Sequence, residues 1–504
     1  MNDQSELITY LDPERPFSPL DAGALKPDSR HIFFDSKLDL FRAYQRKPQI
    51  IVGRRGAGKT AFLESAHFSN PKDLIVSINK ATCFGQIVLS IEGIPQGGRY
   101  PEAIASLWDS VITTIIIDAA VKRYPELRIS RDYLGKIGTG SNSSPESIGW
   151  TLLNTLRDVQ KGKTVGTIAE LISRLHSVSY HEAKQELVDH LNKRKEKVLV
   201  LMDSLESEGY ILDDPNTLSA LKGLLKWIGD IGESSDPIHI RVSIPGEYYF
   251  EFVELSSNPI KDFGRSSVLK WQPRQLISLA ASRLLLSLSV RGNSRYNKWN
   301  KIDISDPTNA VRLFDEFLPK KNPVEMPGGA LLFMLRHTQL VPRHFFLILN
   351  EFFSHVREGE EAAPNSVTSA VEHTANLIVR EIFGAYSHRY PKAAKVVGRI
   401  LPQMPEVFTF DALENSWRRY GRAEFEEFLD FVDMLFDIGA MGVIVDRSSN
   451  YLKAQFQYDH THRMNASPKD TFCMHPTFRL MFREAQTSIP SRIYPVGTSQ
   501  SVES

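Results

Sequence analysis

The sequence predicts an α/β core, a mostly parallel β-sheet with helices on its faces, followed by an all-α lid and a small α+β domain of winged-helix order. Three observations predict this architecture. Short apolar β runs alternate with helical stretches up to residue 271, only apolar-periodic helices follow up to about residue 385, and two helices then precede a β hairpin. Short strands separated by helices favour parallel pairing, because parallel strands need long crossover connections.

Composition limits the classes of protein that fit. A chain of 504 residues, 42% hydrophobic and 24% charged, can bury a large core and is long enough for about three domains. Lys+Arg 60 and Asp+Glu 60 cancel, which excludes indiscriminate electrostatic binding of nucleic acid over the whole surface. Any contact with DNA is therefore expected to be local.

Cysteine usage and the ends of the chain indicate the compartment. Cys83 and Cys473 are the only cysteines and lie in apolar stretches, which suits a reducing compartment and gives no disulfide or metal framework. The N-terminus is polar and acidic, unlike a signal peptide, and the apolar helical stretch 111–121 contains Asp118. We expect a buried helix there, a cytoplasmic protein and no membrane contact.

The core is expected to span residues 31–271, after an N-terminal extension (1–30) that wraps the surface without a core of its own. A helical insertion at about 81–197 separates the second strand from the third and is a candidate partner surface. The expected strands are residues 49–52, 74–78, 198–202, 238–244 and 267–271.

Three further segments follow the core. The lid is expected at residues 272–385, the winged-helix domain at 386–485 and a Ser/Pro-rich disordered tail at 486–504. In the winged-helix domain the expected elements are helices at 410–419 and 424–436 and hairpin strands at 438–445 and 454–458.

A glycine loop carries the most specific motif. Gly53-Arg54-Arg55-Gly56-Ala57-Gly58-Lys59-Thr60 matches G-x-x-x-x-G-K-[ST] directly between an apolar strand and a helix. Glycines let backbone N–H groups turn toward phosphates, Lys59 supplies charge to the β- and γ-phosphates, and the Thr60 hydroxyl ligates Mg²⁺. All eight residues are therefore candidate ligands of ATP in a P-loop NTPase with ATPase activity, although the Arg54 and Arg55 side chains are expected to face solvent or a partner subunit.

A second acidic signature follows the third strand. The apolar run 198–202 ends at Asp203, and an acid at this end of a strand lies beside the phosphate loop, where it holds the Mg²⁺ water shell. Glu206 stands three residues after it, not directly after it. Two interpretations of Glu206 have equal weight: it activates the attacking water, or it caps the next helix.

These residues resemble the AAA+ and STAND ATPases, in particular the origin-recognition-like branch, over about residues 31–480. The resemblance implies a homo-oligomer, a polar sensor at Ser243 and an arginine finger at Arg265, for which a solvated loop arginine is the equal alternative. It implies a second sensor in the lid, at Arg343 with Arg336 as the fallback. The plan of ATPase, lid and winged helix is also similar to bacterial ATPases of anti-phage defence loci, which implies an effector protein encoded nearby.

The winged helix raises the question of duplex DNA. Five basic residues lie near its first helix and its hairpin: Arg418, Arg419, Arg422, Arg447 and Lys453. Five acids on the helix before the hairpin would repel phosphate: Glu426, Glu427, Asp430, Asp433 and Asp437. Three functions follow as hypotheses: an ATP-driven switch that oligomerises, an ATP-regulated DNA-binding protein with little hydrolysis, and a scaffold that recruits an effector through the 81–197 insertion.

Overall fold

The computed structural model describes residues 15–20, 49–64, 72–78, 80–92, 94, 99–137, 178–203, 214–233, 237–319, 329–356, 362–447, 451–460, 463–482 and 491–495. The chain divides into two compact units. Unit 1 comprises Met1–Arg42, Arg54–Gly58 and Lys270–Ser504, and unit 2 comprises Ala43–Gly53 and Lys59–Leu269. The middle of the glycine loop therefore groups with unit 1, while its flanking strand and helix belong to unit 2.

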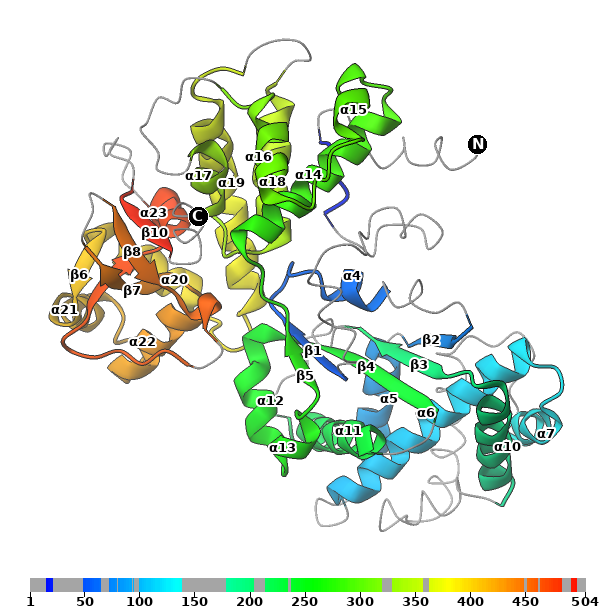
Figure 1. The fold of residues 1–504 in the computed structure, drawn as a ribbon. Coiled ribbons are helices and arrows are strands. Elements are labelled where there is room, and N and C mark those ends of the chain that lie inside the picture. The colour runs from blue at the N-terminus through cyan, green and yellow to red at the C-terminus, as the bar shows by residue number, and fades with distance from the viewer. Residues whose placement is uncertain are drawn as a thin grey trace. The chain divides into compact units, whose positions relative to one another are not determined.

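Unit 2 is built on the predicted parallel sheet (Figure 1). Its strands are β1 (Ile50–Gly53), β2 (Leu74–Ile78), β3 (Val198–Met202), β4 (Ile238–Pro245) and β5 (Ser266–Val268), in the spatial order β2-β3-β4-β1-β5. Every pairing is parallel. The carboxyl ends of β1, β3 and β4 therefore meet at one edge of the sheet, with β4 between the other two.

Helices cover the faces of this sheet, with α4 on one side and α5, α6 and α11 on the other (Figure 1). The described helices of unit 2 are α4 (Lys59–Glu64), α5 (Lys80–Ile91), α6 (Pro101–Arg123), α7 (Arg128–Lys136), α10 (Val178–Arg194), α11 (Pro215–Glu233), α12 (Tyr249–Leu255) and α13 (Pro259–Asp262).

Helix α6 is a core helix. By length and composition it could cross a membrane, but 78% of its apolar window is buried inside the protein. Trp108 donates its indole N–H to the carbonyl of Ala220 on α11 at 3.0 Å. Gly223 allows this close crossing, since a Cβ there would lie 2.3 Å from Ile104 Cγ2. The described helices α5 and α6 of the expected insertion thus contribute to the core of unit 2, whereas residues 138–177 lie outside the described residues.

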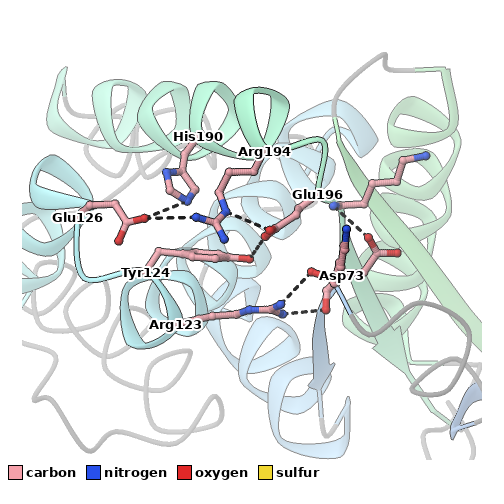
Figure 2. A network of polar contacts seen from close by, with 9 residues as sticks. Asp73, Arg123, Tyr124, Glu126, His190, Arg194 and Glu196 are labelled. Atoms are coloured by element: carbon pink, nitrogen blue, oxygen red, sulfur yellow. Dashed lines mark hydrogen bonds and ion pairs between the residues drawn. The ribbon is translucent and has the colours of Figure 1, made fainter.

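A polar network ties α6 and α10 to the starts of β2 and β3 (Figure 2). The Tyr124 hydroxyl donates to Glu196 Oε2 at 2.5 Å, and Arg194 Nε donates to Glu196 Oε1 at 3.0 Å. Arg123 donates to the carbonyls of Asp73 and Lys72, both at 2.8 Å. Burial and the bond to Glu196 raise the pKa of Tyr124 to about 12. This network lies at the amino ends of the strands, away from the edge where β1, β3 and β4 end.

The helical part of unit 1 is the predicted lid. Its helices are α14 (Pro273–Val290), α15 (Ser294–Trp299), α16 (Pro307–Asp315), α17 (Gly329–Leu335), α18 (Pro342–Ser354) and α19 (Ser366–Ala385). Phe17 is fully buried against Phe314, Phe346 and Phe353, and its N–H donates to Asn350 Oδ1 at 2.9 Å. The N-terminal extension, expected only to wrap the surface, therefore places a side chain in the lid core at residue 17.

The winged-helix part follows α20 (Ala393–Ile400) and contains the two predicted helices, α21 (Phe410–Tyr420) and α22 (Phe428–Asp437). Its strands are β6 (Val407–Thr409), β7 (Met441–Asp446), β8 (Leu452–Gln455), β9 (Thr471–Met474) and β10 (Ile493–Pro495), with helix α23 (Pro476–Phe482) before β10; their order is β10-β8-β7-β9-β6. The expectation of a disordered tail is wrong at β10, which pairs in parallel with β8.

Candidate nucleotide-binding site

The glycine loop contains two backbone positions that favour glycine. Gly56 has φ 80° and Gly58 has φ 92°, both in the left-handed region. A Cβ added to Gly56 would lie 2.8 Å from the Cβ of Arg343, closer than carbon atoms pack. The positive φ therefore explains why glycine is favoured at position 58, which belongs to the motif, and at position 56, which does not. At position 56 the close approach of Arg343 is a second reason.

Carbonyl groups of the loop are held in fixed directions. The Ala57 carbonyl accepts the indole N–H of Trp271 at 2.8 Å. Because a trans peptide places its N–H opposite its carbonyl, the Gly58 N–H points away from Trp271. The buried Lys59 ammonium donates to the Gly53 carbonyl at 2.8 Å. An ammonium has three donors, so one lysine can contact a backbone carbonyl and phosphate oxygens together.

Asp203 lies where the strand order places it, beside the start of α4. Its Oδ2 accepts the Thr60 hydroxyl at 2.6 Å, and its Oδ1 accepts the Ser243 hydroxyl at 2.7 Å. The structure thus brings together three residues that stand far apart in the sequence. A hydroxyl and a carboxylate side by side are the hard oxygen ligands that Mg²⁺ uses beside phosphates, so the donor set fits that ion.

Two other predicted residues have different outcomes. Glu206 lies outside the described residues. Arg265 is exposed on the turn between α13 and β5, where its carbonyl accepts the N–H of Gln49 at 2.8 Å. Exposure fits both an arginine finger directed at another subunit and a solvated loop arginine.

The expectation that Arg54 faces solvent is wrong. Its Nη1 donates to Gln339 Oε1 at 2.7 Å, and its Nη2 donates to the Tyr386 hydroxyl at 2.7 Å and to the Asp437 carbonyl at 2.8 Å. The guanidinium also lies 5.7 Å and 5.8 Å from the ring centroids of Tyr386 and Tyr458. No feature of the motif signals this role, because the position is one that the motif leaves open.

Arg55 behaves more as expected. Its side chain is 52% exposed, and Nε lies 3.8 Å from Glu381 Oε1. This is a loose ion pair at the surface, which contributes little to stability.

The two candidate second sensors lie in different surroundings. The Arg343 N–H is 3.4 Å from the Gly56 carbonyl, and its Nη1 pairs with Glu381 at 2.8 Å. Arg336 is buried instead, donating to the Ser491 carbonyl at 3.0 Å with its guanidinium 4.7 Å from the Tyr494 ring centroid. Arg343 therefore lies against the phosphate loop, and Arg336 holds the segment that ends in β10.

Buried histidines flank these contacts. His344 and His475 are 3% and 0% exposed. Burial lowers the pKa of His344 to about 4 and that of His475 to about 3, in both cases with a further contribution from Arg54. Both imidazoles are therefore neutral near pH 7.

The winged-helix surface carries mixed charge. Arg418 is paired with Glu414 at 2.6 Å. Arg419, Arg422 and Arg447 are exposed, and so are Glu426, Glu427 and Asp430. Among the acids of α22, Asp433 and Asp437 each lie 3.4 Å from Arg463. The exposed side chains of this part therefore carry charges of both signs.

No protein family and no curated protein matches the sequence. Two similar solved structures are the Aeropyrum pernix ORC2 protein, solved as ADPNP-ADP complexes, and Cdc6p from Pyrobaculum aerophilum. The first has 11% identity and a TM-score of 0.38, covering 94% of this chain and 98% of the other. The second has 10% identity and a TM-score of 0.24, covering 97% of each chain.

TM-scores this low carry no argument about the function of this chain. The case for a nucleotide site therefore depends on the contacts of the glycine loop, Thr60, Asp203 and Ser243.

Proposed function

We propose that this protein is a molecular switch that binds and hydrolyses ATP with Mg²⁺. One observation carries the proposal: Asp203 is bound by the Thr60 and Ser243 hydroxyls at 2.6 Å and 2.7 Å, next to a complete G-x-x-x-x-G-K-[ST] loop. Polar side chains placed together at the carboxyl ends of parallel strands are the usual setting of a phosphate and metal site.

The roles of the residues follow from their chemistry. Gly56 and Gly58 shape the loop, Lys59 neutralises phosphate charge, and Thr60 and Asp203 hold the ion that polarises the phosphates. Ser243 positions the Asp203 carboxylate. Arg343 contacts the nucleotide when Glu381 releases it, and Glu206 or another group orients the attacking water.

Arg54 supports a route for the output of the switch. It belongs to the phosphate loop, yet its guanidinium binds a lid residue, Gln339, and the carbonyl of Asp437 at the end of α22. A change in loop conformation on binding or losing phosphate would strain these bonds. Nucleotide state would thereby reach the winged helix, which acts on a partner or on the next subunit.

The turn that carries Arg265 supports self-association. Ile260 on the preceding α13 is 89% exposed, and Arg265 is exposed five residues later. We propose that this surface meets a second copy and presents Arg265 to its nucleotide. Arg265→Ala should then lower ATP turnover without lowering ATP affinity, and mixing it with Asp203→Asn protein should restore turnover only if Arg265 acts between subunits.

The central test compares variants with the unaltered protein in ATP affinity and ATP turnover. The buffer is reducing, as the cytoplasm is, and contains Mg²⁺. Lys59→Ala should lose both, and Asp203→Asn should lose turnover. Lys193→Ala, an exposed lysine on α10, is the control and should behave as the unaltered protein. Unchanged affinity and turnover in Lys59→Ala would refute the proposal.

The second candidate function is ATP-regulated DNA binding with little hydrolysis. It rests on the exposed Arg419, Arg422 and Arg447 of the winged-helix part. Duplex DNA should then bind with strong salt dependence and weaken on replacing these three arginines together. The biological role, including the anti-phage defence implied by similarity of plan, is tested by phage challenge of cells carrying the gene with and without its neighbours, among which an effector is expected.

A further inference from the structure

Three potential metal ligands lie close together on α18 and α19, the helices that carry Arg343 and its partner Glu381. Glu351 lies on α18, His355 caps the end of that helix, and His373 lies on α19. His373 Nδ1 is 3.1 Å and His355 Nε2 is 3.3 Å from the same carboxylate oxygen, Glu351 Oε1. One ligand atom from each residue lies within 4.8 Å of the others.

These distances are those of hydrogen bonds, of which His373 Nδ1 and Glu351 Oε1 form one, and they also suit a shared metal ion. In a tetrahedral site with metal–ligand bonds of about 2.1 Å, neighbouring ligand atoms are about 3.4 Å apart. Both nitrogen–oxygen distances are close to this value. The two rings are inclined at 72° with centroids 6.2 Å apart, and half-exposed side chains can rotate to bring their nitrogens nearer.

The ligand types also select the metal. Two imidazoles and one carboxylate suit borderline ions such as Zn²⁺, and the same set is used by zinc sites that keep a fourth position for water. Mg²⁺ and Ca²⁺ prefer oxygen ligands, so this cluster differs in kind from the pair of Thr60 and Asp203.

The cluster and the Arg343–Glu381 pair join the same two helices, eight residues apart on each helix. Arg343 on α18 pairs with Glu381 on α19. Glu351 is eight residues after Arg343, and His373 is eight residues before Glu381, as two antiparallel helices require. Eight residues of helix span about 12 Å. The two cross-links thus lie on one helix pair, and a metal at the far one would stiffen the pair that positions Arg343.

We propose that Glu351, His355 and His373 form a binding site for Zn²⁺ or a similar divalent transition metal, with water as the fourth ligand. A metal ion bound there would cross-link the C-terminal end of α18 to α19. The site does not depend on ATP binding, so its test is separate from that of the switch.

The test titrates ZnCl₂ into the chelator-treated full-length protein by calorimetry, and Co²⁺ by visible absorption, which reports tetrahedral coordination. The unaltered protein should bind a metal ion with micromolar or tighter affinity, and hydrogen exchange of α18 and α19 should slow on binding. His355→Ala and His373→Ala should each weaken binding by at least about tenfold, since losing even a supporting residue costs 10–100-fold.

His388→Ala is the matched control, an exposed histidine just after α19, and should change nothing. Glu351→Gln keeps the size of the side chain and should weaken binding while leaving the circular dichroism unchanged. Absence of Zn²⁺ binding in the unaltered protein, or undiminished binding in the His355→Ala/His373→Ala double variant, would overturn the proposal.

Discussion

Replacing Arg54 by alanine tests whether the phosphate loop is mechanically joined to the winged helix. The substitution removes three hydrogen bonds of 2.7–2.8 Å from a charged donor. Such bonds contribute roughly 1–2 kcal/mol each, and partner groups left unsatisfied add to the loss, so we expect a cost of at least about 3 kcal/mol. That is a large part of the free energy of unfolding of an ordinary domain.

The assay is equilibrium urea unfolding followed by tryptophan fluorescence, with hydrogen exchange reporting the peptides around residues 339, 386 and 437. Arg54→Lys keeps the charge but lacks the planar fork that reaches several acceptors, so it should recover less than half of the loss. A double-mutant cycle with Gln339→Ala should give a coupling energy of at least about 1 kcal/mol.

The neighbouring Arg55 supplies the control. It is half exposed with a loose ion pair at 3.8 Å, so Arg55→Ala should change stability by less than about 0.5 kcal/mol. If Arg54→Ala were as harmless as Arg55→Ala, or if exchange around residue 437 stayed at its normal rate, the inferred link between the loop and the winged helix would be refuted.

Three further predictions concern other parts of the chain. Gly56→Ala should weaken ATP binding and cost at least about 1–2 kcal/mol of stability, because φ is 80° there; denaturation and nucleotide titration check this. The folded-state pKa values of His344 and His475 are depressed to about 4 and about 3, so the stability they contribute is present above pH 6.5 and lost as pH falls through 4 and 3; urea unfolding across pH 3–8 should show the decline. Tyr124→Phe, which keeps the ring but removes the donor to the buried Glu196, should lower stability by about 1–3 kcal/mol in thermal unfolding without changing ATP affinity.

The sequence predicts the sheet of unit 2 well for a physical reason. Strands of a parallel sheet are buried on both faces, so they appear as continuous apolar runs, and β2 and β3 begin and end where such runs do. The fifth strand is the exception. We expect residues 267–271 to be extended, whereas β5 covers Ser266–Val268 and one further N–H, that of Leu269, still donates to the Val52 carbonyl at 2.7 Å.

Short strands of the winged-helix part escape prediction because their partners are distant. β6, β9 and β10 have three or four residues each, too few for alternation to stand out, and β10 pairs with a strand about 40 residues earlier. The 81–197 segment is longer than a minimal core requires, and this length alone indicates an added partner surface. The close crossing at Gly223 that joins α6 to the core leaves no local trace in the sequence.

The site shows the same division between local and distant information. The contact of Thr60 with Asp203 could be predicted, because Thr60 has a fixed place in the motif and Asp203 directly follows a strand. Arg54 could not be found, because its partners at residues 339, 386 and 437 follow it by hundreds of positions.

The positions that the phosphate-loop motif leaves open are the ones that make the contacts specific to this protein. Between the first and second motif glycines, Arg54 binds the lid and the end of α22, the Gly56 carbonyl faces the Arg343 N–H, and the Ala57 carbonyl accepts from Trp271. The motif does not fix the residue type at these three positions. A loop whose open positions contact Trp271, the lid and the end of α22 cannot move without disturbing these contacts, and that is what a nucleotide-dependent switch requires.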